Sequence, residues 1–308
     1  MSYVATLICD PARPVLDADR LAAVRACVPG LSESDTLAPG VAEDLAFELA
    51  PKDRASEEAA PEAIAEIERA IRDRLGDAPV DVVVQKRAGR RKRLLIADMD
   101  STMIGQECID ELADVLGKKA EISQITERAM RGELEFEPAL RERAAMLAGL
   151  DAGIVDTVLA TKITVTPGAR MLVQTMRADG AYCALVSGGF TVFTSVVAEW
   201  LGFHEHRANR LESTDGKLTG RVAEPILGRQ AKRDRLSALL AEQGLPAEAA
   251  LAVGDGANDL AMIDLAGLGV AYHAKPAVAA VADARIDHGD LTALLYIQGY
   301  RAADFVRD

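Results

Sequence analysis

LLIADMDST, residues Leu94–Thr102, is a short apolar run that ends in two aspartates and two hydroxyl residues. Two comparable runs follow later in the chain, CALVSGG at 183–189 and LAVGDG at 251–256, and each leads into a helix-like pattern. Continuous apolar runs of this length are typical of strands that are buried on both faces of a parallel sheet. Ligands of such sheets bind at the carboxyl ends of the strands. The sequence therefore predicts a site before any function is considered, at the polar residues that end these runs.

The segment between the first two runs, from Glu107 to about Lys162, is helical in pattern and too long for a simple βαβ crossover. We expect it to form an inserted helical cap over about 105–163. Further on, Asp215-Gly216 is a turn sequence between two polar-apolar stretches, which predicts a hairpin over 209–222. The expected fold class is α/β, a Rossmann-like parallel sheet with an inserted cap.

The N-terminal part of the chain predicts a small α+β domain of the ferredoxin-like type, because its pattern follows the order β-α-β-β-α-β. We place its boundary so that residues 1–88 form this domain and residues 89–308 form the second one. The expected elements are strands at 3–9, 35–37, 43–49 and 80–84 and helices at 18–28 and 61–75, with Pro61 at the start of the second helix.

Composition limits the class of protein. The chain has 308 residues, which favours two domains, and 49% hydrophobic with 27% charged residues is typical of globular proteins. A net charge of −13 argues against a dedicated nucleic-acid or anionic-membrane binder. The basic stretch KRAGRRKR at 86–93 is the exception, and we interpret it as a solvated linker.

Cysteine spacing and hydropathy indicate the compartment. The four cysteines have no paired spacing typical of zinc sites or disulfide frameworks, so we expect a reducing, cytoplasmic environment. No apolar run approaches the roughly 18 residues of a membrane helix, and the first ten residues lack the basic start of a signal peptide. We expect a soluble protein that binds neither membranes nor nucleic acid. A homodimer remains an open alternative.

The acids at the strand ends carry the first functional prediction. Asp98 and Asp100 stand two apart after the first run, and mutual repulsion would raise the pKa of one of them. A nucleophile and a general acid need that asymmetry, although a helix N-cap explains the same residues. GDGAND at 254–259 adds Asp255 and Asp259 at another strand end. Four acids in one crevice require a cation, and oxygen ligands without Cys or His favour Mg²⁺.

Two further residues suit an anionic substrate. Ser187 begins SGGF, a hydroxyl with flexible backbone amides near a helix start, which fits a phosphate. Lys232 is either a cation that neutralises phosphate or a solvated helix lysine. A serine nucleophile is a weaker alternative, because the chain has no G-x-S-x-G motif and its four histidines form no recognisable triad.

DMDST, SGGF with a downstream lysine, and GDGAND together resemble the haloacid dehalogenase-like phosphatases. GQECIDEL, RAMRGELEFEPALRERAAML, ANRLESTDGKLTG and GRQAK make the likeness strongest to the phosphoserine-hydrolysing members, over about residues 94–297. The resemblance implies an Mg²⁺-dependent enzyme that hydrolyses O-phosphoserine through an aspartyl-phosphate in the last step of serine biosynthesis. It also implies that the N-terminal domain is ACT-like.

The resemblance implies a role for each matching residue. Asp98 would be the nucleophile and Asp100 the general acid and base. Metal ligation would fall to Asp98, Asp255 and the carbonyl of Asp100, with support from Asp259. The implied substrate-binding residues are Glu107 for the ammonium, Arg143 for the carboxylate, Met130 and Phe136 to exclude water, and Ser187, Gly188, Lys232 and Asn258 around the phosphate.

Alternatives to these assignments stay open at this point. Glu107 could be an acid that favours a helix start, Arg143 a surface arginine, and Met130 and Phe136 plain core residues. The substrate could be another small phosphorylated amino acid or metabolite, or the chain could be a catalytically silent protein that senses serine. The segment at residues 10–14, DPARP, lacks the glycine expected in the ligand-binding turn of an ACT domain. A packing or dimerisation role for the N-terminal domain is therefore an equal alternative to serine regulation.

Overall fold

The computed structural model describes residues 2–49 and 60–307 and divides the chain into two compact units. Unit 1 comprises Met1–Lys92 and Arg285–Asp308, and unit 2 comprises Arg93–Ala284. The expected boundary at residue 88 lies close to this division. The expected continuous second domain, 89–308, differs from it, because the C-terminal segment packs with the N-terminal unit.

Unit 1 has the predicted order of elements and an antiparallel sheet with strand order β2-β3-β1-β4. Its elements are β1 (Ser2–Ile8), α1 (Ala18–Arg25), β2 (Leu31–Ala38), β3 (Ala42–Glu48), α2 (Ala60–Leu75) and β4 (Asp81–Lys86). Each βαβ half places another strand between its two strands, as in a ferredoxin-like fold. The two weak strand candidates of the sequence, 35–37 and 43–49, are both strands.

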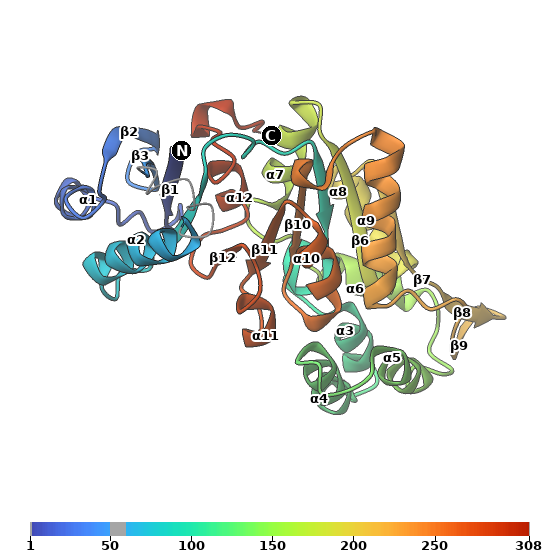
Figure 1. Cartoon of the computed structure of the whole chain (residues 1–308). Helices are drawn as coiled ribbons and strands as arrows, with labels where there is room; N and C mark the ends of the chain where they lie inside the picture. Colours follow the sequence, from blue (N-terminus) through green and yellow to red (C-terminus); the bar gives the residue numbers. More distant parts are fainter. Residues whose placement is uncertain (1, 50–59, 308) are drawn as a thin grey trace. The chain divides into compact units, whose positions relative to one another are not determined.

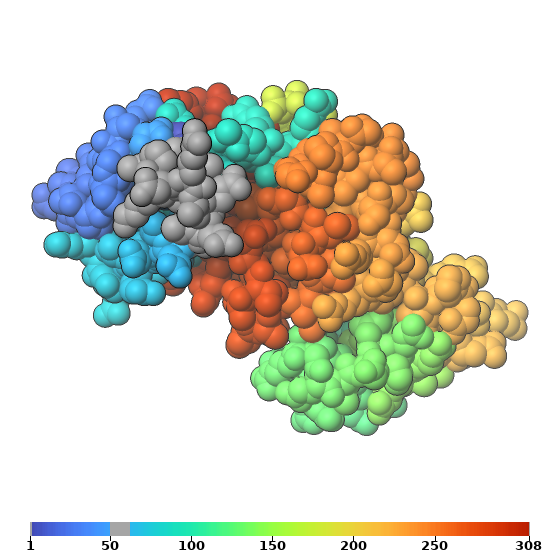
Figure 2. All heavy atoms as spheres, in the orientation of Figure 1, coloured from blue at the N-terminus to red at the C-terminus, as the bar shows by residue number. Residues whose placement is uncertain are grey.

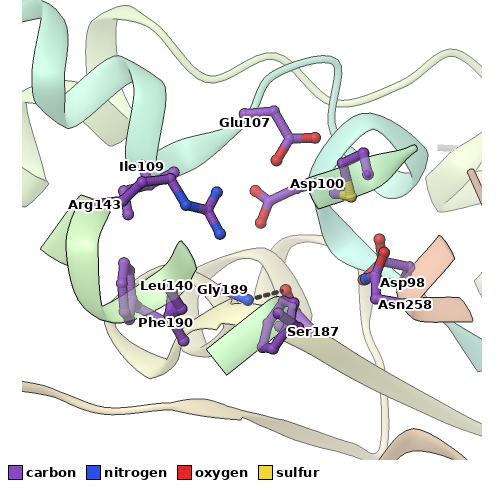
Figure 3. Close-up of a pocket in the computed structure, with 13 residues that line it drawn as sticks. Asp98, Asp100, Glu107, Ile109, Leu140, Arg143, Ser187, Gly189, Phe190 and Asn258 are labelled. Carbon is purple, nitrogen blue, oxygen red and sulfur yellow. Dashed lines mark hydrogen bonds between the residues drawn. The ribbon is translucent and has the colours of Figure 1, made fainter. Parts of the chain in front are cut away.

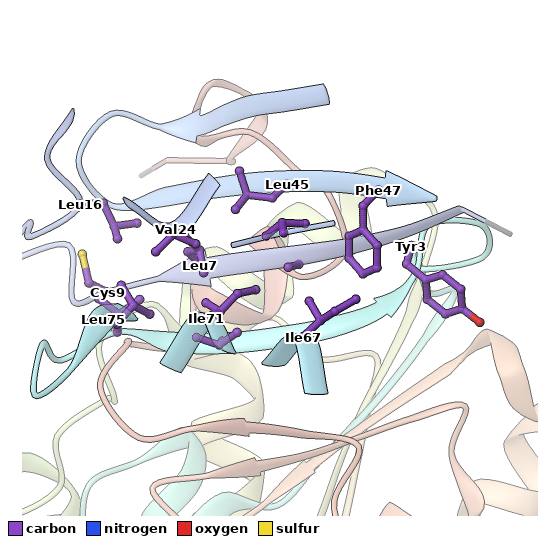
Figure 4. Packing of buried hydrophobic residues seen from close by; sticks show 14 residues of the cluster. Tyr3, Leu7, Cys9, Leu16, Val24, Leu45, Phe47, Ile67, Ile71 and Leu75 are labelled. Atoms are coloured by element: carbon purple, nitrogen blue, oxygen red, sulfur yellow. The ribbon is translucent and has the colours of Figure 1, made fainter. Parts of the chain in front are cut away.

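One face of this sheet forms the core of unit 1 (Figure 4). Alternate residues of β1, among them Leu7, point at the helices, since successive side chains of a strand face opposite sides. They pack against Phe47 of β3 and against Ile71, which is fully buried on α2. The apolar spacing of the second helix thus buries one helix face on the sheet.

Part of the basic stretch at 86–93 has partners within unit 1, whereas Lys86, Arg87 and Arg93 are exposed. Arg90 forms an ion pair of 2.6 Å with the buried Asp44, and the Arg91 guanidinium carbon lies 3.7 Å from the centre of the Tyr300 ring. Lys92 is buried. The interpretation as a solvated linker was therefore wrong for Arg90 and Lys92, which pack within the domain.

The C-terminal segment is tied to unit 1 by the buried carboxylate of Asp81. This carboxylate accepts backbone hydrogen bonds from Asp287 and Gly289, each at 2.8 Å, and from His288 at 3.2 Å. The Gln85 side chain also donates to the carbonyl of Ile297 at 2.6 Å. Buried backbone groups need such partners, which explains why the segment leaves the second domain.

Unit 2 is built on the strands β11-β10-β5-β6-β7 of a six-stranded sheet, whose remaining edge strand, β12, lies at the boundary of the two units (Figure 1). The four neighbouring pairs from β11 to β7 are parallel. The strands are β5 (Leu94–Ala97), β6 (Tyr182–Phe190), β7 (Glu205–Asn209), β10 (Ala250–Gly254), β11 (Leu268–Tyr272) and β12 (Ala284–Ile286). The accompanying helices are α7 (Ala169–Ala178), α8 (Thr191–Leu201), α9 (Arg229–Gln243), α10 (Leu260–Leu265), α11 (Pro276–Ala279) and, in unit 1, α12 (Ala293–Tyr296). The three apolar runs are strands of one parallel sheet, as predicted.

The inserted cap consists of four helices, and a hairpin packs against it (Figures 1 and 2). These elements are α3 (Cys108–Asp114), α4 (Lys119–Met130), α5 (Phe136–Ala145), α6 (Ile154–Thr161), β8 (Leu211–Thr214) and β9 (Lys217–Val222). The hairpin turns at Asp215 and Gly216, both with positive φ, as its turn sequence predicts. Backbone hydrogen bonds of 2.8 Å join Leu218 to Gly149 and to Leu150.

No described helix of the chain is long and apolar enough to cross a bilayer.

We predict that Asp81→Asn lowers the free energy of unfolding by about 2 kcal/mol, because an amide cannot accept all the backbone hydrogen bonds that the carboxylate accepts. Urea unfolding measures this loss. Asp77→Asn, at an exposed position just before β4, is the matched control and should leave the urea midpoint unchanged. Equal midpoints for the two variants would contradict the role given to Asp81.

Candidate active site

The acids of two neighbouring strands meet at the carboxyl edge of the sheet. β5 and β10 run side by side with Ala97 opposite Val253, and the amide of Asp98 donates to the Val253 carbonyl at 3.0 Å. Asp98 and Asp255 therefore leave the sheet at the same level. One ligand oxygen each of Asp98, Asp255 and Asp259 lie within 4.8 Å of one another, and all three residues are buried.

Asp100 is positioned by the turn that follows β5. The chain turns over Met99–Met103, where Asp100 has extended backbone angles and Ser101 has a φ of 54°. This turn directs the Asp100 carboxylate into the cavity beneath the cap (Figure 3). The backbone N–H of Cys108 donates to it at 3.1 Å. Asp98, Asp255 and Asp259 thus form the carboxylate cluster, and the Asp100 carboxylate faces the cavity that Asp98 also lines.

Lys232 lies between two of the clustered acids. It enters from α9 and is only 2% exposed, with its Nζ 2.5 Å from Oδ1 of Asp98 and 2.6 Å from Oδ1 of Asp259. Burial disfavours its charged form, but the two carboxylates outweigh burial and raise the pKa of Lys232. Of the two interpretations left open for this lysine, the solvated one is wrong.

The end of β6 supplies a hydroxyl and two glycines to the same cavity. The amide of Gly189 donates to Ser187 Oγ at 2.8 Å. A side chain on Gly188 would lie 2.7 Å from the ring of Phe136, and one on Gly189 would lie 2.7 Å from Asp100. Only glycine lets the strand end approach the cap and the acids so closely.

Asn209 is a positioning residue of this strand end that the sequence analysis missed. Its side-chain amide donates to the Gly188 carbonyl at 2.8 Å and accepts from the Leu227 amide at 2.7 Å. It therefore joins the SGG segment to the loop that precedes α9. A polar residue at the end of β7, the next parallel strand, was the available signal.

The cap closes the cavity with the residues that the sequence analysis singled out. The cavity is about 30 Å³ in volume, and Glu107, Met130, Phe136 and Arg143 all line it (Figure 3). Arg143 is only 5% exposed, so it is no surface arginine, and its guanidinium points into the cavity. Glu107 accepts a 2.6 Å hydrogen bond from Ser101.

The structure thus brings the predicted site residues to one place. The cavity is lined by Asp98, Asp100, Glu107, Met130, Phe136, Arg143, Ser187, Gly188 and Asn258. Lys232, Asp255 and Asp259 lie just outside it and are joined to Asp98 through the contacts above.

The clustered acids fit a hard cation. Oδ1 of Asp255 and Oδ1 of Asn258 are buried oxygens without a hydrogen-bond partner among the residues that the structure describes. Buried oxygens of this kind are costly unless a ligand or an ion satisfies them. Lys232 supplies a single positive charge to three carboxylates. Oxygen-only donors of this kind suit Mg²⁺ or a similar ion.

Burial and mutual repulsion raise the pKa values of the acids. Burial and the Asp259 charge raise the pKa of Asp98 to about 7, and burial and the Asp98 charge raise the pKa of Asp100 to about 6. Burial, then the Asp100 charge, raises the pKa of Glu107 to about 8. Titration near neutral pH is what acid–base chemistry in a cleft requires.

Comparison with known proteins identifies the family of the chain. Residues 95–264 match the model of the haloacid dehalogenase-like hydrolases. The phosphoserine phosphatase of Streptomyces coelicolor is 44% identical over 71% of this chain and 54% of its own length, so the chain spans about half of that relative.

Two solved structures are similar to the chain. A phospho-aspartyl intermediate analogue of phosphoserine phosphatase is 39% identical, with a TM-score of 0.64, over 67% of this chain and 98% of its own. A HAD family hydrolase from Salmonella enterica serovar Typhi is 27% identical, with a TM-score of 0.80, over 97% of this chain and 98% of its own.

We predict that the metal-free protein loses stability as the pH rises from about 5 to 8. Because the folded-state pKa of Asp98 is raised from 3.8 to about 7, folding takes up a proton, and the stabilising contribution disappears as the pH passes the folded value. Urea unfolding in chelator at several pH values measures the slope. Asp98→Asn removes one titrating acid and relieves its neighbours, so its slope should be shallower. Identical slopes for the two proteins would contradict the assignment.

Proposed function

The chain belongs to the haloacid dehalogenase-like hydrolases, and from this premise we propose that it hydrolyses O-phosphoserine to serine and phosphate through an aspartyl-phosphate. The observation that carries the proposal is the position of Asp98. It is buried in contact with Lys232, and it lines one cavity with Asp100, Glu107 and Arg143. One cavity thus combines groups suited to phosphoryl transfer with two charges suited to an amino acid.

The reaction follows from the roles of two carboxylates. An oxygen of Asp98 attacks phosphorus, the bond between phosphorus and the seryl oxygen breaks, and Asp100 gives its proton to the departing oxygen. Asp100 then takes a proton from water, which attacks the aspartyl-phosphate and frees Asp98 with release of phosphate. The pKa of about 6 of Asp100 suits both directions of proton transfer near neutral pH.

The phosphoryl oxygens meet groups that carry positive charge or donate hydrogen bonds. Lys232 supplies charge next to Asp98, and the Ser187 hydroxyl and the Gly188 amide lie at the end of β6. Asn258 lines the same part of the cavity. Donors that are already fixed stabilise the charge of a transition state without reorganisation.

We propose that the enzyme uses Mg²⁺ as its cofactor. Asp98 and Asp255 would hold the ion with the Asp100 carbonyl, and Asp259 would support them, which agrees with the unpartnered Asp255 oxygen. When bound, the ion would neutralise the clustered carboxylates and polarise the phosphoryl group. It would thereby keep Asp98 ionised for its attack.

The cap supplies the discrimination for a zwitterion. In this proposal the substrate ammonium lies against Glu107. Burial and the Asp100 charge raise the pKa of Glu107 in the empty cavity, and the positive charge of the ammonium would favour its ionised form. Arg143 suits a carboxylate because its planar guanidinium binds two oxygens at once. Met130 and Phe136 line the same cavity and would keep water out.

The reaction would be the last step of serine synthesis, in the cytoplasm. Unit 1 carries none of the proposed catalytic residues. The prediction that unit 1 serves in dimerisation or packing therefore stays a prediction.

We expect phosphate release from O-phosphoserine to require Mg²⁺ and to exceed release from other phosphorylated metabolites. Asp98→Asn should lower kcat by at least about a thousandfold without loss of folding, because an amide is no nucleophile. Asp234→Asn, at an exposed position on α9, is the matched control and should keep full activity. Substantial turnover by Asp98→Asn, or equal rates for all substrates without metal, would refute the proposal.

Recognition of the substrate carboxylate makes a separate prediction. Arg143→Ala should raise KM for O-phosphoserine by about a hundredfold, because a buried charge-assisted pair is lost, and leave turnover of p-nitrophenyl phosphate nearly unchanged. Arg141→Ala, an exposed arginine on the same helix, should leave both substrates unaffected. Glu107→Gln should likewise weaken phosphoserine selectively. An unchanged KM for O-phosphoserine in both site variants would contradict the roles of Arg143 and Glu107 in substrate recognition.

A further inference from the structure

Behind Arg143, a buried chain of hydrogen bonds links three helices of the cap. We infer that Thr126 is a positioning residue, anchored by Asp110, that aims the Arg143 guanidinium at the carboxylate of the substrate. The inference rests on the proposed function, and it adds a determinant of specificity that does not touch the substrate.

The distances define this chain. Thr126 Oγ1, on α4, lies 2.8 Å from Oδ1 of Asp110 on α3 and accepts from Nη1 of Arg143 on α5 at 3.0 Å. Ser123 Oγ donates to the other oxygen of Asp110 at 2.6 Å. Thr126, Asp110 and Arg143 are 3%, 7% and 5% exposed, so water does not compete for these bonds.

The hydroxyl of Thr126 can donate one hydrogen bond and accept others. The Asp110 carboxylate can only accept hydrogen bonds, so the Thr126 hydroxyl donates its hydrogen bond to Asp110. The hydroxyl oxygen can then accept a hydrogen bond from Arg143. The Ile122 carbonyl, at 3.1 Å, is the weaker alternative partner for that proton. Asp110 thereby sets the direction of the hydroxyl, and the hydroxyl sets the direction of the guanidinium.

Arg143 keeps its remaining donors for a ligand. Its Nε donates to the Ala139 carbonyl at 3.1 Å and its Nη1 to Thr126, and Nη2 has no hydrogen-bond partner among the residues that the structure describes. The guanidinium faces the cavity (Figure 3). Two contacts on one side thus hold the group while the other side is open to a carboxylate.

A hydroxyl suits this position better than a second carboxylate would. An acid in direct contact with Arg143 would form an ion pair that competes with the substrate for the same donors. Thr126 transmits the orientation without placing a negative charge on the guanidinium. Burial lowers the pKa of Arg143 and outweighs the opposite effect of the nearby acids, and a substrate carboxylate would compensate that loss of hydration.

The experiment compares Thr126→Val, which keeps the shape and loses the hydroxyl, with Thr126→Ser, which keeps the hydroxyl. Kinetics are measured on O-phosphoserine and on O-phosphoethanolamine, which has the phosphate and the ammonium but no carboxylate. We expect Thr126→Val to lower kcat/KM for phosphoserine about tenfold, mainly through KM, and to leave phosphoethanolamine within about twofold. Thr126→Ser should restore the preference.

Two further variants isolate the pathway. Ser123→Ala removes the other hydroxyl on Asp110, which does not contact Arg143, and should keep the wild-type preference. In an Arg143→Ala background, Thr126→Val should have no further effect on phosphoserine, since the two residues act as one unit. If Thr126→Val does not fold, Asp110→Asn is measured in its place with the same expectation.

The outcomes separate this inference from the proposed function. If the wild-type chain prefers phosphoserine and Thr126→Val weakens both substrates equally, or neither, then Thr126 has only a structural role and the inference is wrong. An additive loss in the Arg143→Ala background would also overturn it. If the wild-type chain does not hydrolyse phosphoserine, the proposed function fails first and the carboxylate contact of Arg143 fails with it.

Discussion

Repulsion between buried carboxylates is the constraint on which the site depends. Parallel strands β5 and β10 end at the same level, so the acids that follow them must lie close together, away from bulk water. The fold tolerates this because Lys232 enters from α9 and contacts two of them. A single cation leaves the cluster short of positive charge, and that shortage is the reason why we propose a metal ion there.

Core and cap divide the chemistry between them. The sheet edge holds the groups that we propose for phosphoryl transfer, and its glycines keep the backbone close to the acids. The cap brings in a carboxylate, Glu107 just before α3, and a cation, Arg143 on α5, and neither helix takes part in the sheet. Because the two sets come from different layers, the substrate can change through the cap while the reaction stays the same.

Unit 1 is a ferredoxin-like sheet that recruits the end of the chain. Asp81 accepts three backbone N–H groups of the C-terminal segment, and the basic stretch at 86–93 finds acidic and aromatic partners within the same unit. Composition alone suggested a solvated linker there, because a sequence pattern does not reveal which acids lie opposite a run of arginines.

The amino-acid pattern predicted the parallel sheet, the cap, the hairpin and the positions of Asp98 and Asp255, because strand runs and turn residues are local patterns. Through a family likeness it also pointed to Glu107 and Arg143. Only the tertiary structure decided that Lys232 is a buried cation, that Asn209 holds the SGG segment, and that Thr126 stands between Asp110 and Arg143. These contacts join residues on separate elements, and no local periodicity encodes a partner that lies far away along the chain.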